Sequence, residues 1–391
     1  MSRILLAWEL GYNLGHLSRL RPLARRLRER GHTVLVAARD LTGAARALAP
    51  AGIPFIQAPQ AALESRADQI LASYADMLLH QGWGESSQLV GILHAWINLL
   101  RMFSPDAVVL DHSPTAALAA RSLGIRSAWI GTGFEIPPLK VPLPAFPAIP
   151  TDRAAQAESK ALDTANRVLQ AMRLPRLNAL KDLFADSKRW LATYEELDHY
   201  GSRAGEEYVG VFNEIGYGKA VEWAGQGNRH VFAYLRPQTP GFETVLKALS
   251  ISSAEVICYA PGVAPNAMAS LARPGFVLSP EPVRVDTLLN HADLCVSYAP
   301  AGTVATTLLR GVPQLCAPPH VEAKLTAGRI ESMGAGLAVK GRQTESGIDE
   351  TIRRMLDVGT CAAAAKKFAE RYKDTDRKAA VDRIACGIEA L

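Results

Sequence analysis

A histidine and an aspartate far apart in the sequence are suited to acid–base chemistry. His16 follows the apolar run at 3–8 across a glycine-containing loop, and Asp111 ends a second apolar run at 107–111. An imidazole can accept a proton at neutral pH, and a carboxylate can fix its tautomer. Open α/β sheets bind ligands at the carboxyl ends of their strands, where both residues are expected. The pair predicts a general base, His16, oriented by Asp111.

Each of these residues also has a purely structural interpretation. His16 could contact only backbone at a helix N-terminus, and Asp111 could cap the helix that begins near Pro114. His112 is an alternative partner, although a neighbouring strand residue should point to the opposite face.

A second feature is suited to phosphate binding. The apolar run at 294–296 breaks at a Pro/Gly turn and is followed by a helix from about Gly302 to Arg310, with the next strand at 314–317. The start of a helix presents free backbone N–H groups and the positive end of the helix dipole. The expected phosphate donors are the amides of Ala301, Gly302 and Thr303, together with the Thr303 hydroxyl.

Short apolar strands alternate with helical segments through most of the chain. In the first half, strands are expected at 3–8, 32–37, 54–57, 107–111 and 127–131, with helices at about 17–30, 61–102 and up to 123. Alternation resumes with strands at 230–235, 254–259, 276–278, 294–297 and 314–317. Nearly continuous apolar strands between helices indicate parallel sheets that are covered on both faces.

The segment at 137–203 interrupts this alternation. It begins with a proline-rich loop and continues with expected helices at about 153–172 and 176–191. A chain of 391 residues exceeds the size at which one core stops growing, about 250–300 residues. Two α/β units with a boundary near 205–228 are therefore expected.

Composition restricts the class of protein. A net charge of +5 and 21% charged residues are ordinary for a globular protein and do not favour nucleic acid binding. Five cysteines without CxxC spacing indicate a reducing compartment, and no signal peptide or transmembrane run is expected, so we predict a cytoplasmic protein. No metal-ligand cluster is recognised, and an incomplete glycine motif at Gly11 and Gly15 argues against NAD.

Motifs in both halves resemble those of GT-B glycosyltransferases of the family 1 and family 28 type. They occur in the expected order over most of the chain: Gly15-His16 with Pro22-Leu-Ala24, Asp106 to Asp111, Gly124 to Gly131, Ala292 to Thr303, Gly311-Val-Pro313, Pro318, Glu322 and Gly334-Ala-Gly336. The resemblance implies two doubly wound Rossmann-like domains facing each other across a cleft. It implies an acceptor-binding domain at 1–215, a donor-binding domain at 216–375 and a C-terminal helix at 376–391 that packs back toward the first domain.

The resemblance also implies site residues. His16 and Asp111 are the catalytic pair. Donor-binding positions are Arg236, Val283, Tyr298, Ala301, Gly302, Thr303 and Glu322, and Trp83 and Phe134 are the aromatic candidates for the acceptor site. Val283 falls where the backbone reads the nucleobase, and Glu322 where an acid holds sugar hydroxyls.

Three positions depart from the family pattern. Tyr298 stands where the family has a phosphate-contacting histidine, and Arg236 could supply the charge that is lost. Ala323 replaces the glutamine that usually follows the acid, and Pro300 also departs from the common glycine-rich form. Arginines 19, 21, 25, 26, 28 and 30 form a basic first helix, for which a solvated face is favoured over membrane-surface contact.

The predicted activity is inverting, metal-independent hexosyl transfer from a UDP- or dTDP-sugar to a hydroxyl of a small-molecule, lipid-linked or protein acceptor, without a further cofactor. The replacements at Tyr298, Pro300 and Ala323 keep a non-catalytic scaffold as the main alternative, with a nucleotide-sugar epimerase as the other.

Overall fold

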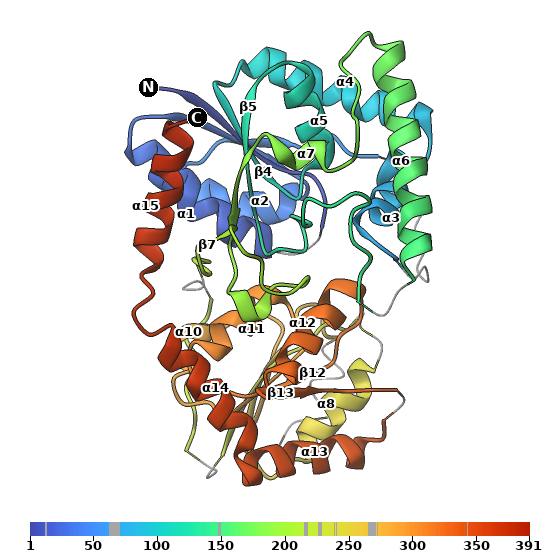
Figure 1. Cartoon of the computed structure of the whole chain (residues 1–391). Helices are drawn as coiled ribbons and strands as arrows, with labels where there is room; N and C mark the ends of the chain where they lie inside the picture. Colours follow the sequence, from blue (N-terminus) through green and yellow to red (C-terminus); the bar gives the residue numbers. More distant parts are fainter. Residues whose placement is uncertain are drawn as a thin grey trace. The chain divides into compact units, whose positions relative to one another are not determined.

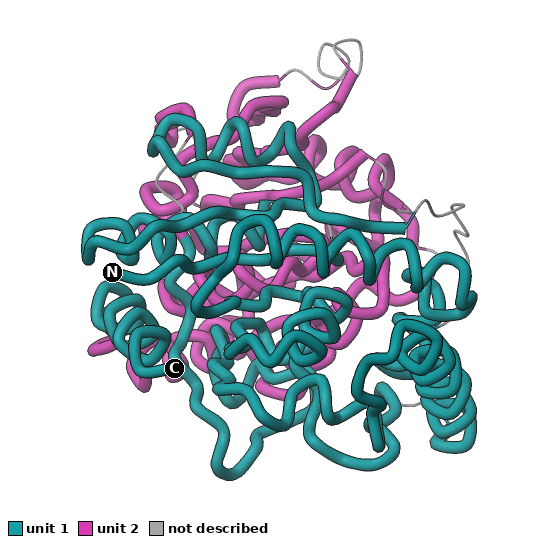
Figure 2. The backbone as a smooth tube through the Cα atoms, turned by 90° about the horizontal axis from the view of Figure 1, so that it is seen from above, with its two compact units in different colours: residues 1–213, 376–391 teal, residues 214–375 magenta. Residues whose placement is uncertain are grey.

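The computed structural model describes the chain except residues 12–13, 62–70, 148–149, 215–217, 226–228, 238, 240, 265–270, 272 and 342. It divides into two compact units, one of Met1–Asn213 with Asp376–Leu391 and one of Glu214–Thr375 (Figure 2). The C-terminal segment therefore belongs with the first unit.

Unit 1 contains a seven-stranded parallel sheet in the order β3-β2-β1-β4-β5-β6-β7. Its strands are β1 (Arg3–Trp8), β2 (Thr33–Ala38), β3 (Phe55–Gln57), β4 (Ala107–Asp111), β5 (Arg126–Gly131), β6 (Lys188–Leu191) and β7 (Glu207–Tyr208). Its helices are α1 (Gly15–Glu29), α2 (Leu41–Leu48), α3 (Tyr74–Leu78), α4 (Ser86–Phe103), α5 (Pro114–Ser122), α6 (Thr151–Ala171), α7 (Asp182–Ala185) and α15 (Arg377–Glu389), with short helical turns η1 (Ala49–Ala51), η2 (Leu79–Trp83) and η3 (Glu195–Leu197).

The first strand and helix show how one face of this sheet is covered. Ile4, Leu6 and Trp8 alternate along β1 and pack with the apolar stripe of α1, which includes Leu20 and Leu23. The C-terminal helix α15 joins the same core and lies beside α1 (Figure 1). Gly387 lets α15 also lie against Trp190 of β6, because a Cβ atom at this position would be 2.4 Å from the Trp190 ring.

The basic first helix is only partly solvated. Arg30 donates to Glu389 of α15 at 2.5 and 2.8 Å, and Arg26 pairs with Asp382 of the same helix. Arg19 is buried. The expectation of a solvated basic face is therefore wrong for Arg19, and two other arginines of α1, Arg26 and Arg30, form ion pairs with α15.

Unit 2 contains a six-stranded parallel sheet in the order β10-β9-β8-β11-β12-β13. Its strands are β8 (His230–Tyr234), β9 (Glu255–Tyr259), β10 (Phe276–Ser279), β11 (Leu294–Ser297), β12 (Gln314–Cys316) and β13 (Gly336–Ala338). Its helices are α8 (Phe242–Ile251), α10 (Val285–Leu288), α11 (Ala301–Leu308), α12 (Val321–Ser332), α13 (Glu345–Val358) and α14 (Thr360–Arg371). Two buried clusters, around Val231 and around Phe232, form its core.

The predicted α/β class is confirmed, although strands β7 and β13 were not expected and the described part of the expected helix at 61–102 is divided into α3, η2 and α4. The segment at 176–191 was expected to be a helix, but it contains only the short α7 followed by strand β6. Trp190 and Leu191 are buried beside β5, because β6 extends the sheet. Part of the expected helix at 61–102 falls at 62–70, outside the described residues.

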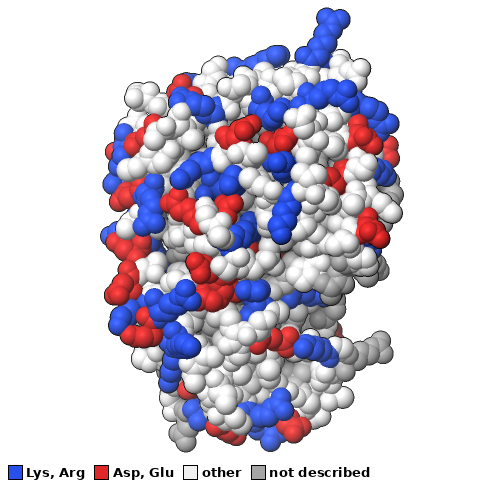
Figure 3. All heavy atoms as spheres, in the orientation of Figure 1, with Lys and Arg blue, Asp and Glu red and all other residues white. Residues whose placement is uncertain are grey.

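On the face shown in Figure 3, basic and acidic side chains are interspersed. None of the described helices combines the length and apolar character that a bilayer span requires.

Candidate active site

The strand order of unit 1 brings His16 and Asp111 together. β1 and β4 are parallel neighbours, with Trp8 opposite Asp111 at their carboxyl ends. The order reverses at this pair of strands, since β2 and β3 lie on one side of β1 and β5 to β7 on the other. Such a switch point leaves a crevice at the strand ends. His16 lies in the first turn of α1, the helix that follows β1 in the sequence.

The imidazole of His16 is held in one tautomer. Its Nδ1 lies 2.7 Å from Asp111 Oδ1, so Nδ1–H donates to the carboxylate and Nε2 keeps its lone pair. Among the described residues, Nε2 has no hydrogen-bond partner. The Trp8 ring stacks on the imidazole with centroids 5.1 Å apart. Gly11, at φ +83, allows this placement, because a Cβ atom there would lie 2.4 Å from Nε2.

Two residues of this cluster were missed in the sequence. Arg19 donates through Nε and Nη2 to both oxygens of Asp111, at 3.0 and 2.6 Å, and Nη2 lies 3.3 Å from Glu135 Oε1. Arg19 follows His16 by three residues and shares the apolar face of α1, so helical spacing could have revealed it. Glu135 comes from the loop after β5, where no periodic pattern marks it.

Charges within the cluster stabilise one another. Burial raises the pKa of Asp111, but Arg19 and His16 more than offset this effect and leave it below its usual range. Burial likewise opposes ionisation of Glu135, yet Arg19 and His16 hold its pKa well below normal. Both acids are therefore carboxylates at neutral pH, and Arg19 is the cation between them.

Ligand atoms of His16, Asp111 and Glu135 lie within 4.8 Å of one another, close enough for a metal ion. Arg19 already donates to both carboxylates at this point. A divalent cation would have to displace the guanidinium, so the donor set fits an arginine better than a metal.

His112 does not take the place of His16. The His112 backbone adopts φ +50, and its ring centroid lies 6.0 Å from that of His16. Asp111 hydrogen-bonds to His16 and not to His112. Burial lowers the pKa of His112 to about 3, so it is neutral.

The aromatic acceptor candidates are both buried. Trp83 is fully inaccessible and donates its indole N–H to Thr115 Oγ1 at 3.0 Å, which places it in the core rather than on a binding surface. Phe134 makes an edge contact with the His112 ring and stacks on Phe146. It is therefore a buried neighbour of His112, next to the His16 site.

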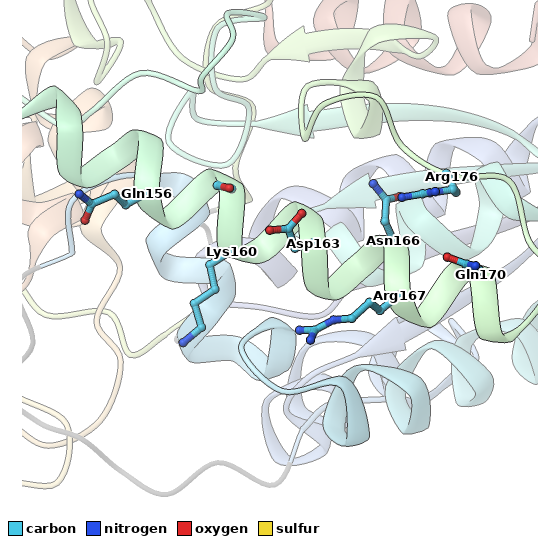
Figure 4. Close-up of a pocket in the computed structure, with 8 residues that line it drawn as sticks. Gln156, Lys160, Asp163, Asn166, Arg167, Gln170 and Arg176 are labelled. Atoms are coloured by element: carbon cyan, nitrogen blue, oxygen red, sulfur yellow. The ribbon is translucent and has the colours of Figure 1, made fainter.

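A hollow of about 590 Å³ in unit 1 runs along α6 and is lined by polar residues, among them Lys160, Asp163 and Arg167 (Figure 4). It contains none of the predicted site residues. A second hollow, about 490 Å³, is lined by Trp8, Gly11, Arg39, Asp40, Leu41, Thr42, Gln57 and Gln60. It shares Trp8 and Gly11 with the surroundings of His16.

Glu9 gives a testable pH dependence of stability. Burial raises its pKa from 4.5 to about 7, although the amides of Thr115 and Ala116 donate to Oε2 at 2.9 and 3.3 Å. Between these pH values the folded chain retains a proton that the unfolded chain has released, so the free energy of unfolding falls as pH rises. Glu9→Gln keeps an acceptor oxygen and removes the titration. Wild type should lose about 2 kcal/mol more than the variant between pH 5 and 7.

Urea denaturation at several pH values measures this difference, with Glu85→Gln, at an exposed position, as the matched control. If the free energy of unfolding changed with pH equally in the wild type and in Glu9→Gln, Glu9 would be ionised throughout this range and the prediction would be wrong.

In unit 2, the turn after β11 leads into α11 at the corresponding switch point. β8 and β11 are parallel neighbours, and the sheet order reverses between them. Ala299 adopts φ +61, and Pro300 is the N-cap residue, so α11 begins at Ala301. No acidic residue lies in the first turn, and Ala301, Gly302 and Thr303 are partly exposed. The first amides of a helix have no partner within it, so this terminus is suited to an anion.

Tyr298 and Arg236 are brought together beside this turn. The Tyr298 hydroxyl donates to Tyr234 Oη at 3.3 Å, and Arg236 Nη2 donates to the same oxygen at 3.4 Å. The guanidinium carbon lies 5.6 Å from the Tyr298 ring centroid. Burial raises the pKa of Tyr298, so the phenol stays protonated. Arg236 supplies a positive charge next to the position where the family has a histidine.

The remaining donor candidates occupy different positions. Glu322 is half-buried in the first turn of α12, and Ala323 beside it is buried. The Lys219 backbone bonds to Pro282 O and Arg284 N, at 2.8 and 3.0 Å. In a parallel pairing, this leaves the amide and carbonyl of Val283 on the opposite side.

Comparison with known proteins adds independent evidence for the architecture. Residues 243–381 match a family model described as the Erythromycin biosynthesis protein CIII-like, C-terminal domain. A comparison with curated protein sequences gave no significant match.

Solved structures match over the whole length. The spinosyn rhamnosyltransferase SpnG is 17% identical with a TM-score of 0.70, covering 99% of this chain and 100% of that one. The glycotransferase of kitacinnamycin is 17% identical, with a TM-score of 0.74 and 99% of each chain covered. SsfS6 from Streptomyces sp. SF2575, solved with thymidine diphosphate, is 20% identical with a TM-score of 0.65 and full coverage of both chains. This chain has the GT-B glycosyltransferase fold. The resemblance in its sequence motifs is thereby confirmed at the level of fold.

Proposed function

We propose that this GT-B protein is an inverting glycosyltransferase that moves a sugar from a UDP- or dTDP-sugar to a hydroxyl group of a small-molecule acceptor. The observation that carries the proposal is the buried pairing of His16 with Asp111, which leaves Nε2 as a base at the switch point of unit 1. A scaffold protein would have no need for a desolvated imidazole held in this tautomer.

In the proposed reaction, the acceptor oxygen attacks the anomeric carbon and its proton passes to His16 Nε2. The bond between that carbon and the phosphate oxygen breaks, and its electron pair leaves with the nucleoside diphosphate. Attack and departure occur on opposite sides of the carbon, so its configuration inverts. The N-terminus of α11 and Arg236 would stabilise the charge that develops on the leaving diphosphate.

The related structures support this choice of substrates. VinC and SsfS6 were solved with dTDP and thymidine diphosphate, and SpnG with a spinosyn aglycone. The hollow beside Trp8 and Gly11 is the candidate acceptor site, because these two lining residues also contact the His16 ring. Glu322 is the candidate for holding sugar hydroxyls, and the Val283 backbone for contacting the base.

Thermal shift with a panel of nucleoside diphosphates and their sugars identifies the donor, because a ligand that binds only the folded state raises the melting temperature. We expect stabilisation by dTDP or UDP and their sugars. No response to any nucleotide would favour the scaffold alternative, and conversion of a nucleotide sugar without acceptor would favour an epimerase.

Arg236 should contribute directly to diphosphate affinity. Charge-assisted hydrogen bonds are worth about 1.5–3 kcal/mol, so Arg236→Gln should weaken binding of the nucleoside diphosphate by roughly 10–100-fold in calorimetry. The matched control is Arg229→Gln, at the opposite end of β8, where the arginine is exposed and pairs with Asp293. Equal affinities in the two variants would rule out a donor-binding role for Arg236.

A further inference from the structure

The charge of Asp111 is already paired before His16 accepts a proton. Arg19 donates to both carboxylate oxygens, and His16 shares Oδ1 with Arg19 Nη2. The side chains of Arg19 and Asp111 are 4% and 0% exposed, so water screens this pair little. In a simple His–Asp pair, the aspartate compensates the imidazolium. Here a bidentate arginine takes up most of that compensation.

Glu135 restores the missing negative charge. Its Oε1 accepts from Arg19 Nη2, while the amide and hydroxyl of Thr132 both donate to Oε2 at 2.6 Å. Only 3% of the Glu135 side chain is exposed. Two carboxylates and one guanidinium leave a net charge of minus one. Protonation of His16 brings the cluster to neutrality, whereas without Glu135 it would leave a buried positive charge.

We propose that Arg19 and Glu135 are positioning residues that set the strength of His16 as a base, with Glu135 providing the charge that balances the imidazolium. Arg19 bonds to Asp111 and Glu135 bonds to Arg19, so the two residues act on His16 through this buried group of charges. This inference rests on the proposed transferase function, in which His16 accepts the acceptor proton.

Other groups near His16 do not duplicate this role. From the end of β4, His112 is neutral. From the end of β1, Trp8 contributes an uncharged ring, and the Glu9 carboxyl is bonded to the amides at the start of α5. Arg39, after β2, donates to the Glu9 backbone carbonyl at 2.8 Å. Among the described residues, Arg19, Asp111 and Glu135 are the charged groups linked to His16 by hydrogen bonds or through one shared partner.

The test compares Glu135→Gln, Arg19→Gln and the double variant. Removing a nearby charge shifts the midpoint of a protonation equilibrium by about one pH unit or more. The midpoint for His16 should therefore shift in opposite directions in the two single variants. In Glu135→Gln, the acidic limb of the kcat–pH profile should move to lower pH, with kcat at the plateau reduced about 10-fold. In Arg19→Gln the limb should move to higher pH. The double variant has the wild-type net charge and should return close to the wild-type midpoint.

A readout that does not need transfer is the NMR titration of the His16 ring, assigned by the resonance that disappears in His16→Gln. Its midpoint should shift in the same directions. The double variant keeps the test decisive if Arg19→Gln does not fold, because it leaves no uncompensated carboxylate pair. The control is Glu206→Gln, which breaks a half-buried pair with Arg189 and should leave the midpoint unchanged.

An unchanged midpoint in Glu135→Gln, or shifts of the same sign in both single variants, would overturn the inference. If the NMR midpoints shift as expected but the wild type transfers no sugar to any acceptor, the charge arrangement stands and the proposed transferase function fails.

Discussion

Replacement of His16 by alanine should lower kcat for sugar transfer by about 10²–10⁴-fold, the usual contribution of a general base. Asp111 remains paired with Arg19 in this variant, so unit 1 should stay folded. Unit 2 has its own buried core and carries the candidate nucleotide site, so the affinity for dTDP or UDP should not change.

Steady-state kinetics and calorimetry on the same preparations separate these effects. His94→Ala is the matched control, because His94 is exposed on α4 of the same unit. Turnover by His16→Ala equal to that of His94→Ala would remove His16 from the mechanism, even if the nucleotide still binds.

Replacement of Asp111 by alanine should have the largest effect on stability. It leaves the Arg19 guanidinium buried without the two hydrogen bonds that it donates to Asp111. Removing one partner of a buried ion pair costs about 3–5 kcal/mol. Five of the six tryptophans lie in unit 1, so tryptophan fluorescence in urea reports mainly on this unit. The midpoint of its unfolding should fall accordingly.

The control for this prediction is Asp382→Ala, which breaks a pair with Arg26 in the same unit. That carboxylate is 44% exposed, so water screens its pair with Arg26 and the loss of this pair should lower stability much less. If Asp111→Ala and Asp382→Ala lost similar amounts of stability, burial of Asp111 would add little to the strength of its ion pair with Arg19.

The fold was predictable from the sequence because apolar strand runs alternate with amphipathic helices. The runs at 3–8, 107–111 and 294–297 match β1, β4 and β11 closely. Strand β6 was missed, since Lys188 and Arg189 start a run with only two large apolar residues. Neighbouring β5 and helix α15, distant in sequence, supply the environment that buries Trp190.

The candidate site was predictable only in part. His16 and Asp111 follow strands that pair in the sheet, so topology alone brings them together. The roles of Arg19 and Glu135 depend on a contact between a side chain of α1 and one of the loop after β5, which the sequence does not show. Because α1 contains several arginines, the sequence did not indicate which of them is buried. Trp83 was placed in the acceptor site because large aromatic residues occur both in pockets and in cores, and composition does not distinguish the two.

The anomeric configuration of the first product tests the central claim most directly. Proton NMR would follow the reaction with the donor identified by thermal shift, using either a sugar acceptor or water as the attacking hydroxyl. Direct displacement assisted by His16 predicts a product with the anomeric configuration opposite to that of the donor. A product that retains the donor configuration would contradict the account, because a single displacement from the face opposite the leaving diphosphate must invert the anomeric carbon.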